Sequence, residues 1–193
     1  MLKMLKTFVV YFHLLATCVA IGSVLMADHT LWSWRNRVLD EIQQQRLAQT
    51  QRVITIALVF LWCSGFALVY LGYMADGVKY LLNEKLWVKL MVVSLLTLNG
   101  VLLHKIGFPR LQRAAFTQLT SMDRVCLSLL GAVSTTSWLF AAFLGIARPW
   151  NYSLPYEQII GFFGVILLAA ITAAVAVSLL MSYPSDKSYG EAL

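Results

Sequence analysis

The chain has 193 residues, of which 60% are hydrophobic and only 12% charged, and its formal net charge is +6. Soluble domains contain about 45–50% apolar and about 25% charged residues, so this composition excludes an ordinary soluble protein. The length is typical of one compact domain. The excess of basic residues is interpreted as a topology signal rather than as nucleic-acid binding, because Lys and Arg of membrane proteins gather in the loops on one side of the bilayer.

Five apolar segments are long enough to cross a bilayer, which takes about 20 helical residues for a hydrocarbon core about 30 Å thick. Because lipid offers the backbone no hydrogen bonds, each segment must be a helix. We therefore predict an all-α polytopic membrane bundle over residues 1–183, followed by a polar tail over residues 184–193. The five predicted spans are residues 7–31, 53–74, 86–108, 124–147 and 156–182.

The connecting segments predict an orientation. The first loop, residues 32–52, is polar and is expected to be helical at the membrane interface. This loop, the third loop and the tail lie on one side and carry nine Lys and Arg residues, against six on the other side. The positive-inside rule then predicts that the N-terminus lies outside and the C-terminus in the cytoplasm. We expect the protein to lie in a bacterial inner membrane.

The three histidines all lie within or at the ends of predicted spans, where ionisable residues are costly and usually functional. Histidine is the commonest ligand of haem iron and of copper. Spans one and three run in the same direction, so His29 and His104 are expected within about one turn of the same membrane face. His13 precedes His29 by 16 residues, or about 24 Å along a helix, and so cannot share their metal. We predict His29 and His104 as axial ligands of a b-type haem.

Small residues on the same helix faces support that prediction without deciding it. Gly22 lies on the His29 side of span one and Gly100 on the His104 side of span three, which leaves room for a flat macrocycle. Small residues also pack membrane helices together, however. The two histidines could equally lie among headgroups or pair with a carboxylate such as Asp28.

His13 has two interpretations, either as a ligand of a second metal site near the opposite face or as a hydrogen-bond partner of a neighbouring helix. A copper-handling protein would use soft ligands, with His13, Cys18 and Met26 as stations. Cysteine and methionine are also common in packed helices. Asn99 and the polar run 134–137 are expected to form hydrogen bonds between helices.

Two short motifs resemble known membrane families. Leu86-Trp-Val-Lys-Leu90 and Pro109-Arg-Leu111 resemble the copper-resistance D family, in which a Leu-x-x-Lys-Leu helix ends at Pro-Arg-Leu. Phe12-His-Leu-Leu15, together with His29 and the Lys-Leu helix, is similar to the short haem-b protoporphyrinogen oxidases. The resemblance covers residues 8–111, and it implies haem b or copper as cofactor.

Three functions remain open from the sequence. The first is a haem-b redox protein that exchanges electrons with a quinone or porphyrin-like substrate. The second is a copper-handling protein or transporter, and the third is a non-catalytic subunit or assembly factor that contacts a second copy or a partner membrane protein. No motif of a soluble hydrolase or kinase occurs, and the sequence leaves open whether the protein is an enzyme.

Overall fold

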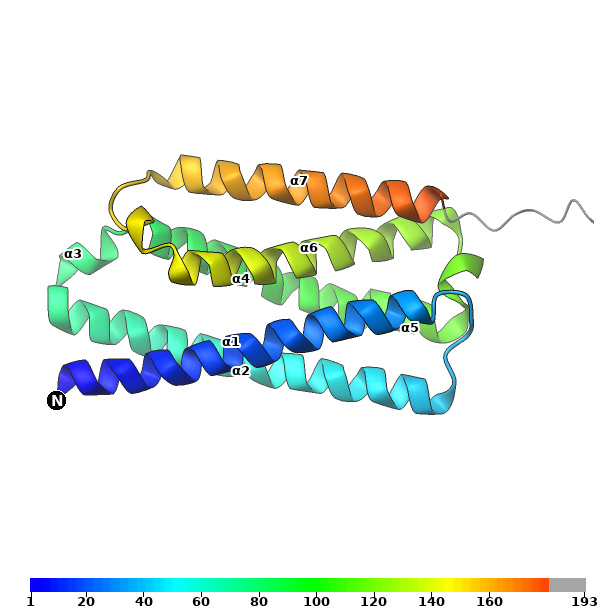
Figure 1. Cartoon of the computed structure of the whole chain (residues 1–193), viewed down its shortest axis with the longest axis horizontal. Coiled ribbons are helices and arrows are strands. Elements are labelled where there is room, and N and C mark those ends of the chain that lie inside the picture. The colour runs from blue at the N-terminus through cyan, green and yellow to red at the C-terminus, as the bar shows by residue number, and fades with distance from the viewer. Residues whose placement is uncertain (181–193) are drawn as a thin grey trace, which may run out of the picture.

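The computed structural model describes residues 1–180, and within them it shows a bundle of five long helices and no strand (Figure 1). Each of the five is long and apolar enough to cross a membrane, so the predicted all-α membrane bundle is confirmed. The predicted tail and the last two residues of the predicted fifth span lie outside the described residues. The long helices are α1 (Leu2–Ser33), α2 (Glu41–Asp76), α4 (Glu84–Leu102), α6 (Ser121–Ile146) and α7 (Tyr156–Leu180).

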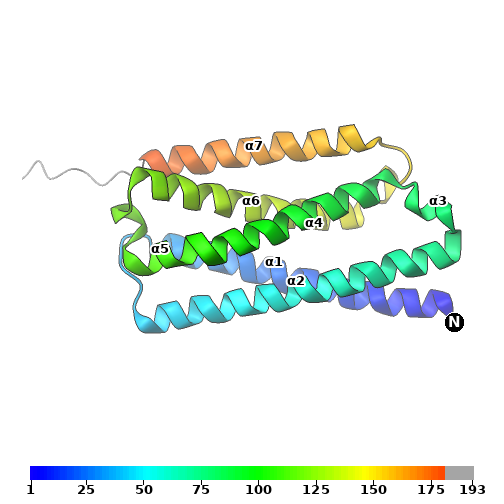
Figure 2. The same ribbon diagram turned by 180° about the vertical axis from the view of Figure 1, so that it is seen from behind.

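Shorter elements connect them. The π-helical turn η1 (Leu103–Gly107) continues α4 into α5 (Phe108–Arg113), and Figure 2 shows α4 and α5 as one extended rod. The other short helices are α3 (Val78–Leu81), η2 (Phe116–Gln118) and η3 (Arg148–Trp150). Consecutive long helices run antiparallel, so the bundle has two ends. We call the end with the start of α1, α3 and η3 the N-terminal end, and the end with residues 34–40, α5 and η2 the cavity end.

The polar first loop is shorter than the sequence suggests, because its second half belongs to α2. Asp40 begins this helix with a capping box: the Gln43 amide donates to Asp40 Oδ1 at 2.7 Å, and the Asp40 amide donates to Gln43 Oε1 at 3.1 Å. The predicted interfacial helix is thus the first part of a helix of 36 residues. At 1.5 Å per residue such a helix is about 54 Å long, well beyond the hydrocarbon core.

Side-chain size differs between the two halves of the α6–α7 pair. Near the N-terminal end, Leu144 and Ile159 are fully buried, and Phe140 packs on Phe163 with ring centroids 5.0 Å apart. Toward the cavity end, α7 contributes mainly alanine over residues 169–176. Small side chains cannot fill the space between the helices there, and a cavity results.

Candidate ligand-binding cavity

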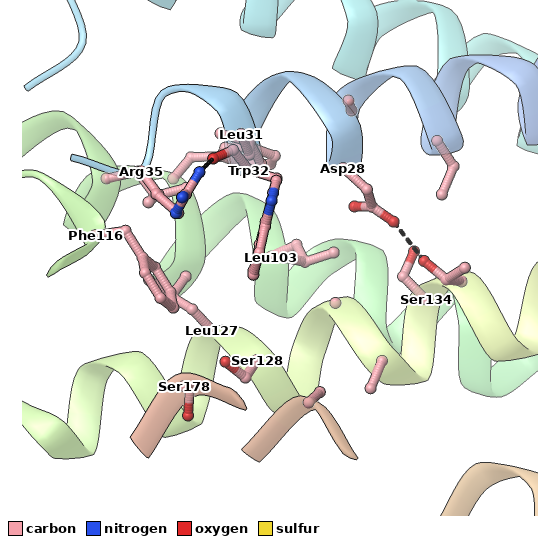
Figure 3. A pocket seen from close by; sticks show the side chains of 18 of the residues that line it. Asp28, Leu31, Trp32, Arg35, Leu103, Phe116, Leu127, Ser128, Ser134 and Ser178 are labelled. Carbon is pink, nitrogen blue, oxygen red and sulfur yellow. Dashed lines mark hydrogen bonds between the residues drawn. The ribbon is translucent and has the colours of Figure 1, made fainter. Parts of the chain in front are cut away.

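A cavity of about 670 Å³ lies between α1, α2, α6 and α7 at the cavity end, with η1 and α5 closing part of it (Figure 3). Its wall is mostly aliphatic and aromatic. On α7 the wall is formed by Ala170, Ala173, Ala174 and Val177, and on α6 it includes Gly131, next to whose Cα there is open space. The cavity therefore exists because residues without bulky side chains face one another across two helices.

One carboxyl–hydroxyl pair interrupts the apolar wall. The Thr135 hydroxyl of α6 donates a hydrogen bond of 2.5 Å to Asp28 Oδ2 of α1, and Figure 3 draws this bond as the dashed line from Asp28. Ser134 lies beside it on α6. A carboxylate in a membrane span is costly, and such residues usually face the bundle interior or a cavity. Asp28 is exposed although it lines the cavity, so the cavity is open to its surroundings.

Aromatic and basic side chains form the wall nearer the helix end. Trp32 lies one turn after Asp28 on the same face of α1, and Phe116 of η2 faces the same space (Figure 3). The Arg35 guanidinium lies 4.8 Å from the centroid of the Trp32 ring, and Arg35 Nη1 donates to the Trp32 carbonyl at 2.8 Å. The Thr117 amide donates to the Arg35 carbonyl at 3.1 Å, and this bond attaches η2 to the loop between α1 and α2. Arg35 is the only Lys or Arg among the described residues that line the cavity.

The two predicted haem ligands lie outside this cavity. His29 and His104 are both exposed, whereas their chain neighbours Asp28 and Leu103 line the cavity. The described part of the lining includes no histidine, cysteine, methionine or tyrosine, so none of these residues offers haem iron an axial ligand inside the cavity. A haem held by the two histidines would have to bind elsewhere, and it stays a prediction.

The two predicted glycines lie on outward-facing surfaces. Gly22 and Gly100 are both exposed, and open space adjoins each Cα. Neither glycine lines the cavity, and their part in making room for a haem stays a prediction.

His13 forms a hydrogen bond between helices. Its Nδ1 lies 2.7 Å from Ser64 Oγ of α2. The Ser64 hydroxyl also lies 2.7 Å from the Phe60 carbonyl, so it can donate either to that carbonyl or to Nδ1, and the bond is compatible with either tautomer of the neutral imidazole. Of the two interpretations of His13, the structure supports the bond to a neighbouring helix.

The proposed copper stations do not gather around His13. Cys18 and Met26 are both exposed on α1. Within residues 1–180, no three His, Cys, Asp or Glu side chains are grouped so that they could hold a metal ion. The copper function stays a prediction that no cluster of described residues supports.

Sequence reasoning passed over Asp28 as a site residue and considered it only as a partner for histidine. The signal was available, because Asp28 is a carboxylate within a membrane span. The sequence does not reveal the partner of Asp28, because Thr135 follows it by 107 positions and only the fold brings the two side chains together. By contrast, the expected interhelical role of Asn99 is confirmed, because its Nδ2 donates to the Leu130 carbonyl of α6 at 3.0 Å.

Comparisons with known proteins found no matching family model, no matching curated protein and no matching solved structure. The fold and the cavity together define a multi-pass helical membrane protein with an apolar cavity between its helices.

Proposed function

We propose that the protein binds a quinone-like molecule in the cavity, with a flat ring that carries polar oxygens and an apolar tail. The observation that carries the proposal is a cavity of about 670 Å³ with an apolar wall and one hydrogen-bonded carboxyl–hydroxyl pair. Small-molecule sites typically occupy about 300–1,000 Å³, with an apolar wall and a few polar groups that fix the orientation.

Each part of such a ligand has a counterpart in the wall. A quinol hydroxyl would donate to the Asp28 carboxylate, and a quinone oxygen would accept the Thr135 hydroxyl proton in place of Asp28. A ligand ring would stack on the face of the Trp32 indole opposite the Arg35 guanidinium, which lies 4.8 Å from the centroid of that ring. The alanine side chains of α7 leave a smooth apolar surface for the tail. A porphyrin is less well matched, because its acidic side chains call for several cations and the described wall offers only Arg35.

Photolabelling in nanodiscs tests the proposal. The protein would be incubated with a quinone that carries a photoreactive diazirine on its tail, and the labelled peptides would be mapped. We expect labelling on α7 and α6, reduced by competing unmodified quinone. Competition by protoporphyrin but not by quinone would overturn the assigned ligand class.

A matched pair of variants on α7 shows whether the cavity is the binding site. Ala173 lines the cavity and Ala176 does not, although both are exposed on the same helix. Ala173→Leu should fill part of the cavity and weaken quinone binding at least 10-fold, whereas Ala176→Leu should leave it unchanged. Equal affinity of both variants and the wild type would contradict the proposal.

The visible absorption spectrum of the same purified protein tests the haem prediction separately. A haem with two axial histidines gives a Soret band and a sharp α band on reduction, and His104→Ala should abolish both. Quinone binding to a protein without these bands would leave the cavity proposal intact and end the haem prediction.

A further inference from the structure

The carboxyl–hydroxyl pair of the cavity wall can accept a hydrogen bond from a ligand but has no uncommitted proton to donate. The Thr135 hydroxyl already gives its proton to Asp28 Oδ2 at 2.5 Å, a length typical of a hydroxyl that donates to a carboxylate. A carboxylate has only acceptor atoms. Within residues 1–180, no donor is bonded to the other carboxylate oxygen, Asp28 Oδ1. The pair therefore offers a ligand one unused acceptor.

The depth of the pair makes a donor for this oxygen scarce. Thr135 is near the middle of α6, which is one of the spanning helices. Hydrocarbon tails cannot donate hydrogen bonds, and a carboxylate at such a depth is costly unless it has partners. Asp28 is exposed where it lines the cavity, and no cation in the described part of the chain forms an ion pair with it. A donor carried by the ligand would therefore stabilise Asp28.

The neighbouring polar side chains do not compensate for this shortage. Ser134 lies beside the pair, but its hydroxyl can donate or accept and so serves either kind of ligand (Figure 3). Arg35 follows Asp28 by about two turns of α1, or about 10 Å, and its guanidinium lies against the Trp32 ring. Asp28 is thus the group that distinguishes a ligand that donates from one that only accepts.

We propose that the cavity prefers the reduced, dihydroxy form of its ligand, a quinol, over the oxidised quinone. This inference rests on the proposed function, in which a quinone-like ring binds in the cavity. A quinol hydroxyl donates to Asp28 Oδ1 and leaves the bond between Thr135 and Asp28 intact. A quinone oxygen only accepts, so it must lie against the carboxylate or take the Thr135 proton and leave Asp28 Oδ2 without its donor. Hydrogen bonds to charged groups are strong, so the preference should be about 10-fold or more.

Three diazirine probes with the same decyl tail test the preference on the full chain in nanodiscs. One carries a 1,4-benzoquinone ring, one the corresponding quinol, and one the dimethyl ether of that quinol, which keeps both oxygens but cannot donate. Each would be titrated separately without oxygen, so that the quinol is not oxidised and no electrons pass between probes. We expect the quinol to reach half-maximal labelling at a concentration about 10-fold or more below those of the quinone and the ether.

Variants show whether Asp28 causes the preference. Asp28→Asn keeps the size of the side chain and supplies an amide that can donate to a quinone oxygen, so the ratio of the two half-maximal concentrations should fall to about one. Thr135→Val removes a donor that only the quinone needs, so the ratio should stay or increase. Asp76→Asn is the matched control, because Asp76 is an exposed aspartate at the end of α2 that does not line the cavity. Comparing ratios between variants cancels any difference in partition into the bilayer.

The outcomes separate this inference from the proposed function. Equal binding of quinol and quinone, weakened for both by Ala173→Leu, would overturn the preference and leave the cavity as a binding site. The preference also fails if the dimethyl ether binds as tightly as the quinol, if Asp28→Asn keeps the wild-type ratio, or if Asp76→Asn changes the ratio as much. Absence of saturable labelling by any of the three probes would overturn both proposals.

Discussion

The two ends of the α6–α7 pair have the same helical backbone but opposite packing. Near the N-terminal end, Leu144 and Ile159 are fully buried and the Phe140 and Phe163 rings fill the space between the helices. At the cavity end, alanines of α7 face Gly131 of α6 and leave a cavity of about 670 Å³. Side-chain volume at a few positions therefore determines which end of the bundle is solid and which can accept a ligand.

The polar groups differ in the same way. At the N-terminal end Lys85 donates to a backbone carbonyl of the Ala147 segment, which attaches α4 to the end of α6. At the cavity end Asp28 and Thr135 bond to each other across α1 and α6 and remain next to open space. One end thus uses its polar groups to attach helices, while the other presents them to the cavity.

The largest effect on stability is expected from removing side-chain volume at the N-terminal end. Leu144→Ala should lower the free energy of unfolding by about 2–5 kcal/mol, because Leu144 is 0% exposed and its removal leaves an unfilled space. Val177→Ala at the cavity end should cost only about 0.5 kcal/mol, because Val177 is 40% exposed and already adjoins the cavity. SDS-induced unfolding followed by circular dichroism measures both, and similar losses would refute the contrast between the two ends.

A smaller effect is expected where a glycine permits close packing. A Cβ on Gly72 of α2 would lie 2.4 Å from Cζ of Tyr80, so Gly72→Ala must displace that ring and should cost about 1–3 kcal/mol. Gly131→Ala at the cavity end meets no neighbouring atom and should be neutral or stabilising by up to about 1 kcal/mol.

The double variant Gly72→Ala with Tyr80→Ala identifies the cause of that loss. If the clash is with the ring, Gly72→Ala should cost much less in the Tyr80→Ala background than in the wild type. If the losses of unfolding free energy in the two single variants simply add in the double variant, the cost of Gly72→Ala does not come from a clash with the Tyr80 ring.

Sequence reasoning predicted the spans because a span is a local property of about 20 consecutive residues. The predicted start of the second span differs from the observed start of α2. The polarity of residues 41–52 suggests a separate interfacial element, although the Asp40–Gln43 capping box marks the beginning of a helix. A long helix that leaves the membrane changes its polarity without ending. Helix boundaries and membrane boundaries are therefore different quantities.

The candidate site was harder to predict, because it depends on the direction of single side chains. Asp28 and His29 are neighbours in the chain, yet they point about 100° apart on α1, so that Asp28 lines the cavity and His29 does not. The sequence favours His29 as a site residue because histidine is a common metal ligand, but this chemistry says nothing about the direction of its side chain. Only the arrangement of α6 and α7 reveals which face of α1 adjoins a cavity.

The smallest effect is expected for Asn99, whose bond to the Leu130 carbonyl lies next to the cavity wall at Gly131. Asn99→Leu should lower the free energy of unfolding by about 0.6 kcal/mol and by no more than about 1.7 kcal/mol, the range measured for hydrogen bonds between membrane helices. The loss is small because the Leu130 carbonyl lies within α6 and keeps its helical partner. SDS unfolding of Asn99→Leu beside Leu144→Ala gives the comparison directly. A loss for Asn99→Leu as large as that for Leu144→Ala would mean that a polar contact, rather than side-chain volume, holds α4 against α6.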